Sequence, residues 1–236
     1  MEVKGATALV TGANRGLGRE FARALSAAGA NVYGAARDAA AISDDGVTAV
    51  ELDVTSDASV TAAAKSCPEV SILINNAGIA RPRNVLQASI DDARQEIEVN
   101  YLGSLRVAQA FAPVLRRNGG GAMVNILSAV SWVAMPRIPT YSASKAAQWA
   151  ISNALRSSLR GQGTLVTGIH LGFADTDLAA AVELEKIPPA AVARAVLAGL
   201  EEDREEVVVD DFSRMVKSKL CRDPAALYPQ IERDFG

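Results

Sequence analysis

The stretch Thr11-Gly12-Ala13-Asn14-Arg15-Gly16-Leu17-Gly18 decides how this chain folds. A short apolar run, residues 6–10, precedes it, and an amphipathic segment, residues 18–28, follows it. This order predicts a strand that enters a helix through a glycine-rich loop. Glycines there let backbone N–H groups and the positive helix end face a pyrophosphate. The spacing is Gly-x-x-x-Gly-x-Gly rather than the ordinary dinucleotide fingerprint, so the loop alone indicates a phosphate site without proving one.

The same alternation of short apolar runs and longer helical patterns continues along the chain. Strands are predicted at 6–10, 31–36, 47–52, 70–74, 122–127, 165–170 and 207–209, and helices near 18–28, 56–66, 90–117, 142–160 and 189–201. Buried strands separated by helices favour a parallel sheet with right-handed crossovers. We therefore expect an α/β, doubly wound Rossmann fold with about seven parallel strands and helices on both faces. Ligands in such folds bind beyond the carboxyl ends of the strands.

Composition narrows the classes of protein. With 236 residues, of which 49% are hydrophobic and 22% charged, we expect a single domain over 1–236 with a C-terminal tail from about 213. A net charge of −3 without a basic run argues against nucleic acid and anionic lipid as partners. Cys67 and Cys221 lie far apart, so neither a disulfide framework nor a metal site is expected. Without a signal peptide or a membrane span, we expect a soluble, cytoplasmic protein.

The end of the second predicted strand bears on cofactor choice. That strand ends Ala35-Ala36-Arg37, where dinucleotide-binding folds often place an acidic residue on the adenosine ribose. Arg37, together with Arg15 in the glycine loop, favours contact with the extra phosphate of NADP. Asp38 is the counter-argument, because a strand one residue longer would bring its carboxylate to the ribose and favour NAD. The two arginines are alternatively solvated side chains.

A second motif is the run Tyr141-Ser142-Ala143-Ser144-Lys145. A phenol titrates at about pH 10 in water, so it transfers protons at neutral pH only where a neighbouring cation stabilises the phenolate. Residues four apart share one face of a helix, which places the Lys145 ammonium within reach of the Tyr141 phenol. With Ser128 upstream and the glycine loop, the pair indicates a nucleotide-dependent redox enzyme.

Together these residues resemble the short-chain dehydrogenase/reductase family in its compact single-domain form, from Thr11 to about Asp211. Six markers stand in the family's order: the glycine loop, Asp53-Val54 after the third strand, Asn75-Asn76-Ala77-Gly78 after the fourth, Asn100 in the following helix, Ser128 ending the fifth strand, and the Tyr141-x-x-x-Lys145 pair.

The resemblance implies roles for these positions. Tyr141 would be the general acid for carbonyl reduction and the base in the reverse direction. Lys145 would hold the nicotinamide ribose and lower the pKa of Tyr141, and Ser128 would polarise the substrate oxygen. Asn100 would anchor a water that links the lysine to solvent. The implied cofactor contacts are Gly12, Asn14, Arg15, Gly16, Leu17, Gly18, Arg37, Asp53, Val54, Asn76, Ala77, Gly78, Tyr141, Lys145, Gly172 and Thr176.

Three positions leave alternatives or depart from the family. Ser131 competes with Ser128 as the active hydroxyl, and the family's separation from the tyrosine favours Ser128. His170, the only histidine, is interpreted as packed or hydrogen-bonded rather than catalytic. After the sixth strand the family usually has Pro-Gly, whereas this chain has Leu171-Gly172. Leucine leaves the backbone freer than proline does, so we expect a less rigid loop but retained cofactor binding.

The segment 129–140 is the main indication of substrate class. Its apolar residues suggest a hydrophobic ketone or aldehyde, although they would equally suit core or dimer packing. The short distance from Thr176 to Pro188-Pro189 leaves little room for a lid and favours an open, tolerant pocket. The apolar side chains of 129–140 in question are Trp132, Val133, Met135 and Ile138.

The sequence therefore predicts an NADPH-dependent carbonyl reductase, reversible as an alcohol dehydrogenase, that acts on a small molecule. By resemblance, helices 90–117 and 142–160 would form a homodimer or homotetramer. One alternative is a non-catalytic NADP(H)-sensing protein of the same fold. Another is an acyl-carrier-protein-linked 3-oxoacyl reductase, which would need a basic patch to bind its acidic carrier. The arginines that could form this patch, or else are solvated side chains on helix surfaces, are Arg116, Arg117, Arg156 and Arg160.

Overall fold

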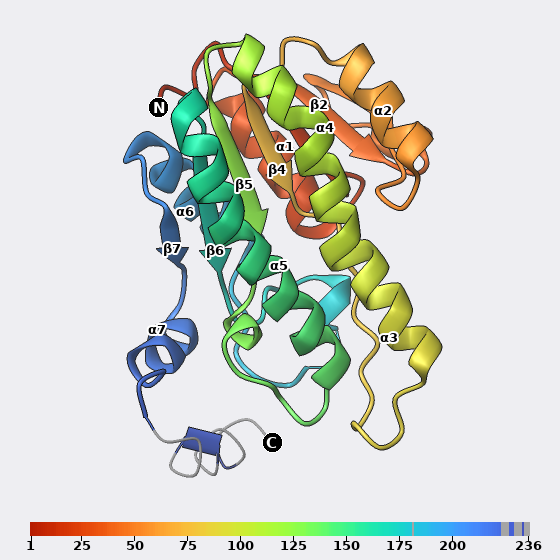
Figure 1. The fold of residues 1–236 in the computed structure, drawn as a ribbon, viewed down its shortest axis with the longest axis vertical. Helices are drawn as coiled ribbons and strands as arrows, with labels where there is room; N and C mark the ends of the chain where they lie inside the picture. The colour runs from red at the N-terminus through yellow and green to blue at the C-terminus, as the bar shows by residue number, and fades with distance from the viewer. Residues whose placement is uncertain (181, 223–226, 229–232, 234–236) are drawn as a thin grey trace.

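The computed structural model describes residues 1–180, 182–222, 227–228 and 233. Seven parallel strands form one sheet in the order β3-β2-β1-β4-β5-β6-β7 (Figure 1). The predicted doubly wound parallel sheet is confirmed. The strands are β1 (Thr7–Thr11), β2 (Asn31–Ala36), β3 (Val47–Glu51), β4 (Ile72–Asn75), β5 (Ala122–Ile126), β6 (Leu165–His170) and β7 (Glu206–Val208).

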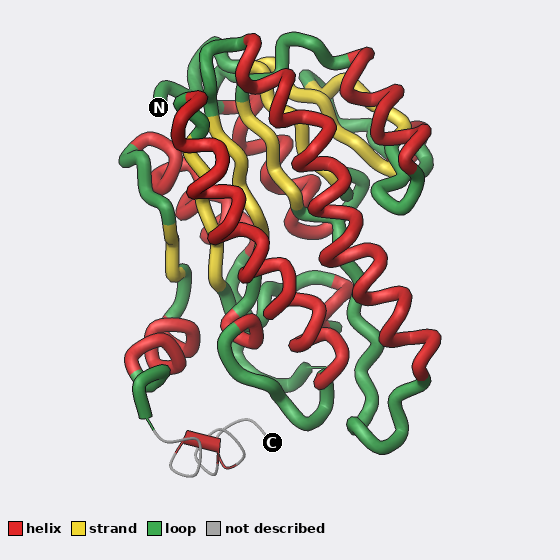
Figure 2. The backbone as a smooth tube through the Cα atoms, in the orientation of Figure 1, coloured by secondary structure: helices red, strands yellow, loops and turns green. Residues whose placement is uncertain are grey.

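Helices cover both faces of the sheet because its strands carry apolar side chains on both sides. Successive residues of a strand point to opposite faces, so in β1 Val10 joins one core cluster while Leu9 joins the other. The first cluster lies under α1 (Gly16–Ala27) and α6 (Pro189–Glu201), and the second under α2 (Asp57–Ser66), α4 (Ser104–Arg117) and α5 (Pro139–Leu159). Figure 2 shows the strands between these two helical layers.

The predicted helix over 90–117 is interrupted. It consists of α3 (Ile90–Glu96), a π-helical segment η2 (Ile97–Gly103) and α4. Asn100 lies in the π-helical segment, and single π turns of this kind often accompany functional sites. The short 3-10 turns are η1 (Ala39–Ala41), η3 (Ala129–Ser131), η4 (Arg160–Gln162) and η5 (Asp177–Ala179).

One further helix, α7 (Asp211–Ser218), was not predicted. Asp210 caps it by accepting hydrogen bonds from the Ser213 N–H (2.8 Å) and hydroxyl (3.1 Å). The helix lies below β7 in Figure 1 and packs against η3, where Val216 is buried together with Val133 and Leu227. The described part of the tail therefore covers its own chain.

The loops that follow the strands meet at one end of the molecule. In Figure 1 the arrowheads of β5, β6 and β7 point to the lower half, and Figure 2 shows connecting loops gathered there. In a parallel sheet the point where strand order reverses, here between β1 and β4, opens a crevice at that end. Within the described ranges no helix has the length and apolar character needed to cross a membrane.

Candidate active site

Two glycines of the loop stand at positions that a side chain would not fit. Gly12 has φ +68°, in the left-handed region that favours glycine. A Cβ on Gly18 would lie 2.2 Å from the carbonyl oxygen of Gly12, so the loop and the start of α1 touch directly. Asn76 Nδ2 donates to Thr11 O at 2.8 Å and ties the loop to the end of β4. Arg15 at the N-cap of α1 makes no side-chain cap, which leaves the first N–H groups of the helix available to an anion.

A cleft of about 1020 Å³ opens from this loop toward the Tyr141 helix. Its volume is at the upper end of the range for small-molecule and cofactor sites. The proposed site residues that line it are Gly12, Asn14, Arg15, Gly16, Leu17, Gly18, Arg37, Asp53, Val54, Asn76, Ala77, Gly78, Ser128, Tyr141, Lys145 and Thr176.

Asn100 is not part of the cleft wall. Its Oδ1 accepts from the Ile79 N–H at 2.8 Å, and its Nδ2 donates to Ile79 O at 2.9 Å and to Ser144 Oγ at 2.8 Å. A Cβ on Gly78 would come within 3.2 Å of Asn100 Oδ1 and 3.8 Å of Lys145 Nζ. Asn100 therefore stands directly behind the cleft and joins the segment after β4 to the Tyr141 helix.

Gly172 is also absent from the wall and packs against α7 instead. Its N–H donates to Asp210 Oδ2 at 2.7 Å, and a Cβ there would lie 2.9 Å from the Phe212 ring. Among the predicted contacts after β6, only Thr176 faces the cleft. The glycine is required here for close approach to the C-terminal helix, and Asp210 restrains the loop that lacks the usual proline.

Lys145 is buried beneath Tyr141. Its Nζ lies 5.8 Å from the centroid of the phenol ring, and donates to Ile126 O and Gln148 Oε1 at 2.8 Å each. Burial lowers the pKa of Lys145 to about 7, so its charge is only partial at neutral pH.

That Lys145 lowers the pKa of Tyr141 stays a prediction, because Lys145 is not among the groups that shift this pKa here. Burial raises the pKa of the Tyr141 phenol, and the charge of Glu96 raises it further. The Lys145 amine donates to Ile126 O and Gln148 Oε1 rather than to the phenol.

Glu96 lies outside the cleft wall but supports it, and it is not among the predicted site residues. It is fully buried at the end of α3, where Oε1 accepts from the Arg81 N–H at 2.6 Å. Its Oε2 is buried with no hydrogen-bond partner among the described residues. Glu96 and Asn100, one turn apart, thus hold the backbone of Ile79–Arg81. A glutamate among polar helix residues looks solvent-facing in a sequence, so only the i, i+4 spacing to Asn100 could have pointed to it.

Of the two competing serines, Ser128 faces the cleft and Ser131 supports it. The Ser128 N–H donates to Ser131 Oγ at 3.1 Å. Ser128 Oγ donates to Leu171 O at 3.2 Å and accepts from the Val130 N–H at 3.3 Å. The Ser128 hydroxyl therefore lines the cleft from the first turn after β5, with Tyr141 and Lys145 reaching the same space from α5.

The arginines at the other end of the cleft differ in their engagement. β2 ends at Ala36, so Arg37 follows the strand directly, and no hydrogen bond or ion pair of its side chain occurs among the described residues. Arg15 is paired with Asp177 at 3.0 Å. The Asp38 carboxylate accepts from the Ala40 N–H at 3.0 Å and caps η1. Of the two charged residues that follow β2, Arg37 is therefore the one whose side chain is available to bind a ligand, because the Asp38 carboxylate already caps η1.

The segment 129–140 contributes less to the cleft than its composition suggested. Trp132 stacks on His170 with ring centroids 3.8 Å apart, and Val133 and Met135 are buried, so only Ile138 of these four lines the cleft. Other apolar side chains line the cleft, beside polar ones such as Arg81, Gln95 and Glu98. Among the aliphatic and aromatic ones are Ile79, Ala80, Pro82, Ile138, Leu171, Phe173, Leu178 and Val182.

This geometry can bind a long phosphate-containing ligand at one end and present an apolar molecule to a hydroxyl, a phenol and an amine at the other. Sequence comparison is consistent with it: the model of the short chain dehydrogenase family matches residues 6–186. An uncharacterized oxidoreductase of Staphylococcus aureus strain USA300 is 32% identical, covering 84% of this chain and 91% of the relative. The 3-oxoacyl-[acyl-carrier-protein] reductase FabG of Vibrio harveyi is 31% identical, covering 77% of this chain and 79% of the relative.

Solved structures give the same result. A short chain dehydrogenase from Burkholderia cenocepacia J2315, crystallised in complex with NADP, is similar with a TM-score of 0.94 and 37% identity, covering 98% of this chain and 99% of that one.

Proposed function

This chain belongs to the short-chain dehydrogenase/reductase family, and we propose that it is an NADPH-dependent oxidoreductase that reduces a ketone or aldehyde to an alcohol, reversibly. The observation that carries the proposal is that Ser128, Tyr141 and Lys145 line the same cleft as the glycine loop.

The residues present fit a dinucleotide. The Gly12–Gly18 contact leaves a cradle without side chains at the uncapped start of α1, which suits a pyrophosphate. Arg37 makes no hydrogen bond or ion pair within the described residues and follows the end of β2, where the adenosine ribose would lie, and this supports NADP over NAD. The relative of known structure that is 37% identical was solved with NADP. Asp53, whose pKa is lowered by hydrogen bonds from Thr55, would hold the adenine side with Val54.

Bound NADPH would supply the hydride for reduction of the carbonyl carbon. Tyr141 would give its phenolic proton to the carbonyl oxygen, and in the reverse direction the phenolate would take a proton from the alcohol. The phenol is protonated at neutral pH, which is the form that reduction requires, and a cation beside the phenolate would help the proton to leave. Ser128 Oγ would exchange its bond to Leu171 O for the substrate oxygen and stabilise the charge that develops there.

Lys145 and Asn100 would support the proton transfer. Lys145 Nζ lies beside Gly78 at the cleft floor, where it would bind ribose hydroxyls in place of Ile126 O or Gln148 Oε1. With a pKa of about 7 it would take up and release protons at neutral pH, as replacing the proton of Tyr141 requires. Asn100 would keep this floor in place through Ile79.

We propose a hydrophobic carbonyl substrate and an open pocket with broad tolerance. The support is the set of apolar side chains that line the cleft, among them Ile79, Ala80, Pro82, Phe173, Leu178 and Val182. We further propose that 1–236 is one catalytic and cofactor-binding domain, that it works in the cytoplasm, and that it assembles as a homodimer or homotetramer. Exposed apolar side chains at Val85, Leu86 and Ile90 support such association.

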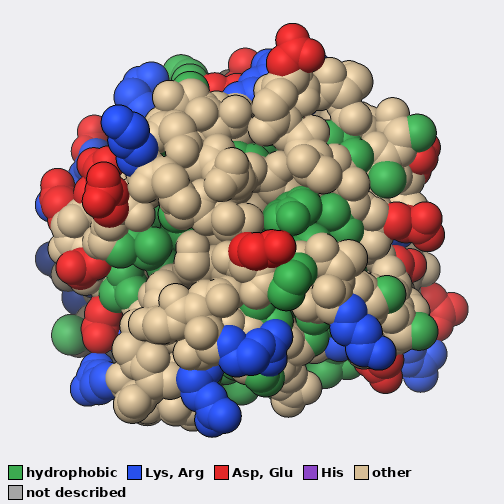
Figure 3. Space-filling model, turned by 90° about the horizontal axis from the view of Figure 1, so that it is seen from above, with side chains coloured by type: hydrophobic (Ala, Val, Ile, Leu, Met, Phe, Trp, Pro, Cys, Tyr) green, Lys and Arg blue, Asp and Glu red, His purple; other side chains and the backbone are tan. Residues whose placement is uncertain are grey.

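The relative named as a 3-oxoacyl-[acyl-carrier-protein] reductase makes an acyl carrier substrate the second candidate. The four arginines predicted as a basic patch do not form a docking surface for an acidic carrier beside the cleft. Arg156 and Arg160 both pair with Glu205. Arg116 and Arg117 end α4 at the opposite end of the sheet from the cleft, and Figure 3, which looks onto that end, shows acidic and basic side chains interspersed. A carrier bound there would be remote from Tyr141.

The test is a panel of ketones of increasing bulk, including a 3-oxoacyl thioester, assayed by NADPH oxidation and repeated with NADH. We expect turnover of several hydrophobic ketones, with NADPH preferred. Turnover of the thioester alone would support the second candidate. NADPH binding without turnover of any ketone or aldehyde would support the non-catalytic sensing protein, and a single small accepted ketone would contradict the tolerant pocket.

A further inference from the structure

Ser128 is held from behind by a polar group that the proposed reaction does not use. Two backbone hydrogen bonds join its segment to β6 and to the residue that follows it: the Leu127 N–H donates to Ile169 O at 2.8 Å, and the Ala129 N–H donates to Leu171 O at 2.9 Å. Between them the backbone of Ser128 has no partner on the backbone of β6. Its N–H donates to Ser131 Oγ, and its carbonyl accepts from the Ser131 N–H at 3.0 Å.

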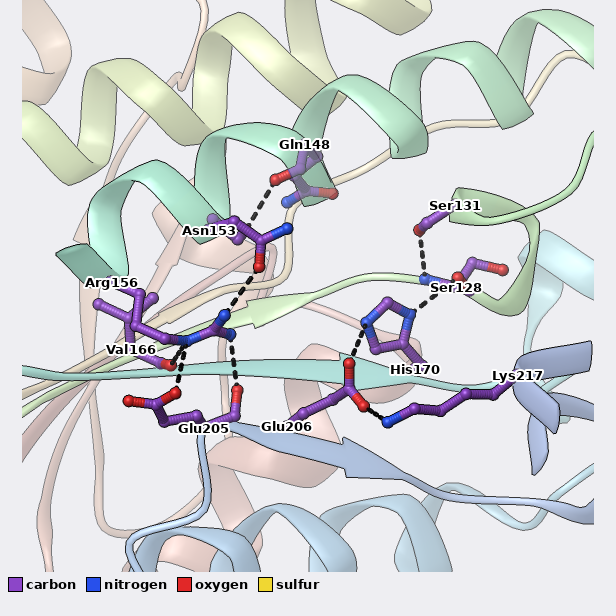
Figure 4. Close-up of polar contacts among 11 residues, drawn as sticks. Ser128, Ser131, Gln148, Asn153, Arg156, Val166, His170, Glu205, Glu206 and Lys217 are labelled. Carbon is purple, nitrogen blue, oxygen red and sulfur yellow. Dashed lines mark hydrogen bonds and ion pairs between the residues drawn. The ribbon is translucent and has the colours of Figure 1, made fainter. Parts of the chain in front are cut away.

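The His170 side chain fills this gap. His170 Nδ1 lies 3.2 Å from Ser128 O, as Figure 4 shows. A carbonyl oxygen only accepts hydrogen bonds, so Nδ1 carries the hydrogen and His170 is the donor. The local turn through Ser131 fixes the shape around Ser128. His170 adds a side-chain contact from β6 to the Ser128 carbonyl, beside the two backbone bonds and the bond from Ser128 Oγ to Leu171 O.

The histidine is itself firmly placed. It is 1% exposed, and its ring stacks on Trp132 at 3.8 Å with an angle of 15° between the planes. Its Nε2 faces Glu206 Oε2 at 3.9 Å, too far for a hydrogen bond, and Glu206 is paired with Lys217 of α7.

The charge state of the ring agrees with this tautomer. Burial lowers the pKa of His170 to about 4, with smaller contributions from Lys217 and Arg156, and the ring is therefore neutral at physiological pH. A neutral imidazole has one N–H, and the geometry at Ser128 O assigns it to Nδ1.

We propose that His170 is a positioning residue for Ser128: its Nδ1–H fixes the Ser128 carbonyl, and through it the direction of the Ser128 hydroxyl that polarises the substrate. The proposal rests on the proposed function for its catalytic consequence but not for its geometry. Small misplacements of a catalytic group reduce rates strongly, so one buried hydrogen bond at this position is expected to matter. The competing explanation is that His170 only fills space against Trp132.

Two substitutions separate these explanations because each keeps one property of the ring. In His170→Asn the side-chain amide nitrogen replaces Nδ1 as the donor, but the ring stack is lost. In His170→Phe the stack on Trp132 is kept, but the donor is lost. If His170 positions Ser128, kcat should fall about tenfold more in His170→Phe than in His170→Asn, while Tm falls more in His170→Asn. NADPH binding should stay within about twofold in both.

If His170 only packs, His170→Phe should be the better variant in both kcat and Tm, and that order would overturn the proposal. Lys217→Met is the matched control, since it breaks the pair with Glu206 on the far side of the ring and leaves the contact with Ser128. Its kcat should remain within about twofold of the unsubstituted protein; a loss as large as that of His170→Phe would also overturn the proposal.

A second measurement does not depend on activity. His170 is the only histidine, so protein labelled with ¹⁵N-histidine gives one imidazole whose two nitrogen signals are assigned without ambiguity. The expected spectrum has a protonated Nδ1 and an unprotonated Nε2 between pH 6 and 8. The opposite tautomer, or titration near pH 6.5, would refute the proposal even if the enzyme proves active. If no ketone is reduced but the Nδ1–H tautomer is observed, the proposed function fails and the contact stands.

Discussion

Replacing Arg37 by alanine is the sharpest test of cofactor choice. Arg37 follows β2 at the cleft and has no hydrogen bond or ion pair among the described residues, so a ligand phosphate need not displace a protein partner. A hydrogen bond to a charged group contributes about 1.5–3 kcal/mol, which corresponds to roughly 10- to 150-fold in a dissociation constant. We predict that Arg37→Ala weakens NADP⁺ by about that factor and NAD⁺ by less than about twofold.

The comparison with Arg15 follows from its ion pair. Arg15 is held by Asp177 at 3.0 Å, so it gains a phosphate contact only by giving up that carboxylate. Arg15→Ala should therefore weaken NADP⁺ by only a few-fold, less than Arg37→Ala does. Arg23→Ala is the matched control, because Arg23 lies on α1, pairs with Asp44 and does not line the cleft.

The assay is isothermal titration of NADP⁺ and NAD⁺ at one fixed ionic strength, because exposed charge contacts depend on salt. The ratio of the two dissociation constants is the quantity of interest. Equal weakening of both cofactors by Arg37→Ala would show that the guanidinium does not meet the 2′-phosphate, and the assignment to NADP would lose its structural support.

Three further predictions concern the rest of the site. The free energy of unfolding should rise from pH 7 toward pH 10.5. Burial lowers the pKa of Lys145 from 10.5 to about 7, so between these two pH values the unfolded chain holds a proton that the folded chain has lost. Urea titrations across this pH range should show the rise in the unsubstituted protein and not in Lys145→Met. Gly18→Ala, whose Cβ would lie 2.2 Å from the carbonyl oxygen of Gly12, should lower the affinity for NADPH at least about tenfold, whereas Gly161→Ala, with open space around it, should not. Equal NADPH affinities of the two variants would contradict a phosphate site at the Gly12–Gly18 contact. Glu96→Gln removes a charge that raises the pKa of Tyr141, so the pH midpoint of alcohol oxidation should move to lower pH, and an unchanged midpoint would remove Glu96 from the electrostatics of the site.

The sheet was predictable because buried parallel strands read as continuous apolar runs with clear ends. The predicted bounds of β2 and β6 coincide with the observed ones, Asn31–Ala36 and Leu165–His170. The π-helical segment at Asn100 was not predictable, since an apolar pattern of helical period passes through it without a break. Helix α7 was missed because it is short, although Asp210 three residues before Ser213 is a capping signal.

The residues of the local motifs could be predicted to lie at the cleft from the sequence, whereas positions that depend on tertiary contacts could not. The glycine loop and the Tyr141-x-x-x-Lys145 pair face the cleft as expected. An apolar residue such as Val133 suits a pocket and a core equally, so only the structure separates them. The role of Gly172 is likewise invisible in the sequence, because it depends on Asp210 and a helix far along the chain.

Proton transfer by Tyr141 is the central step of the proposed reaction. The most direct measurement is single-turnover oxidation of bound NADPH by an accepted ketone in Tyr141→Phe, with the NADPH dissociation constant measured on the same sample. We predict a loss of roughly 10²- to 10⁴-fold in the rate, with NADPH affinity within about twofold, because the substitution removes the proton and little cofactor contact. A variant that turns over at nearly the original rate would contradict the central claim.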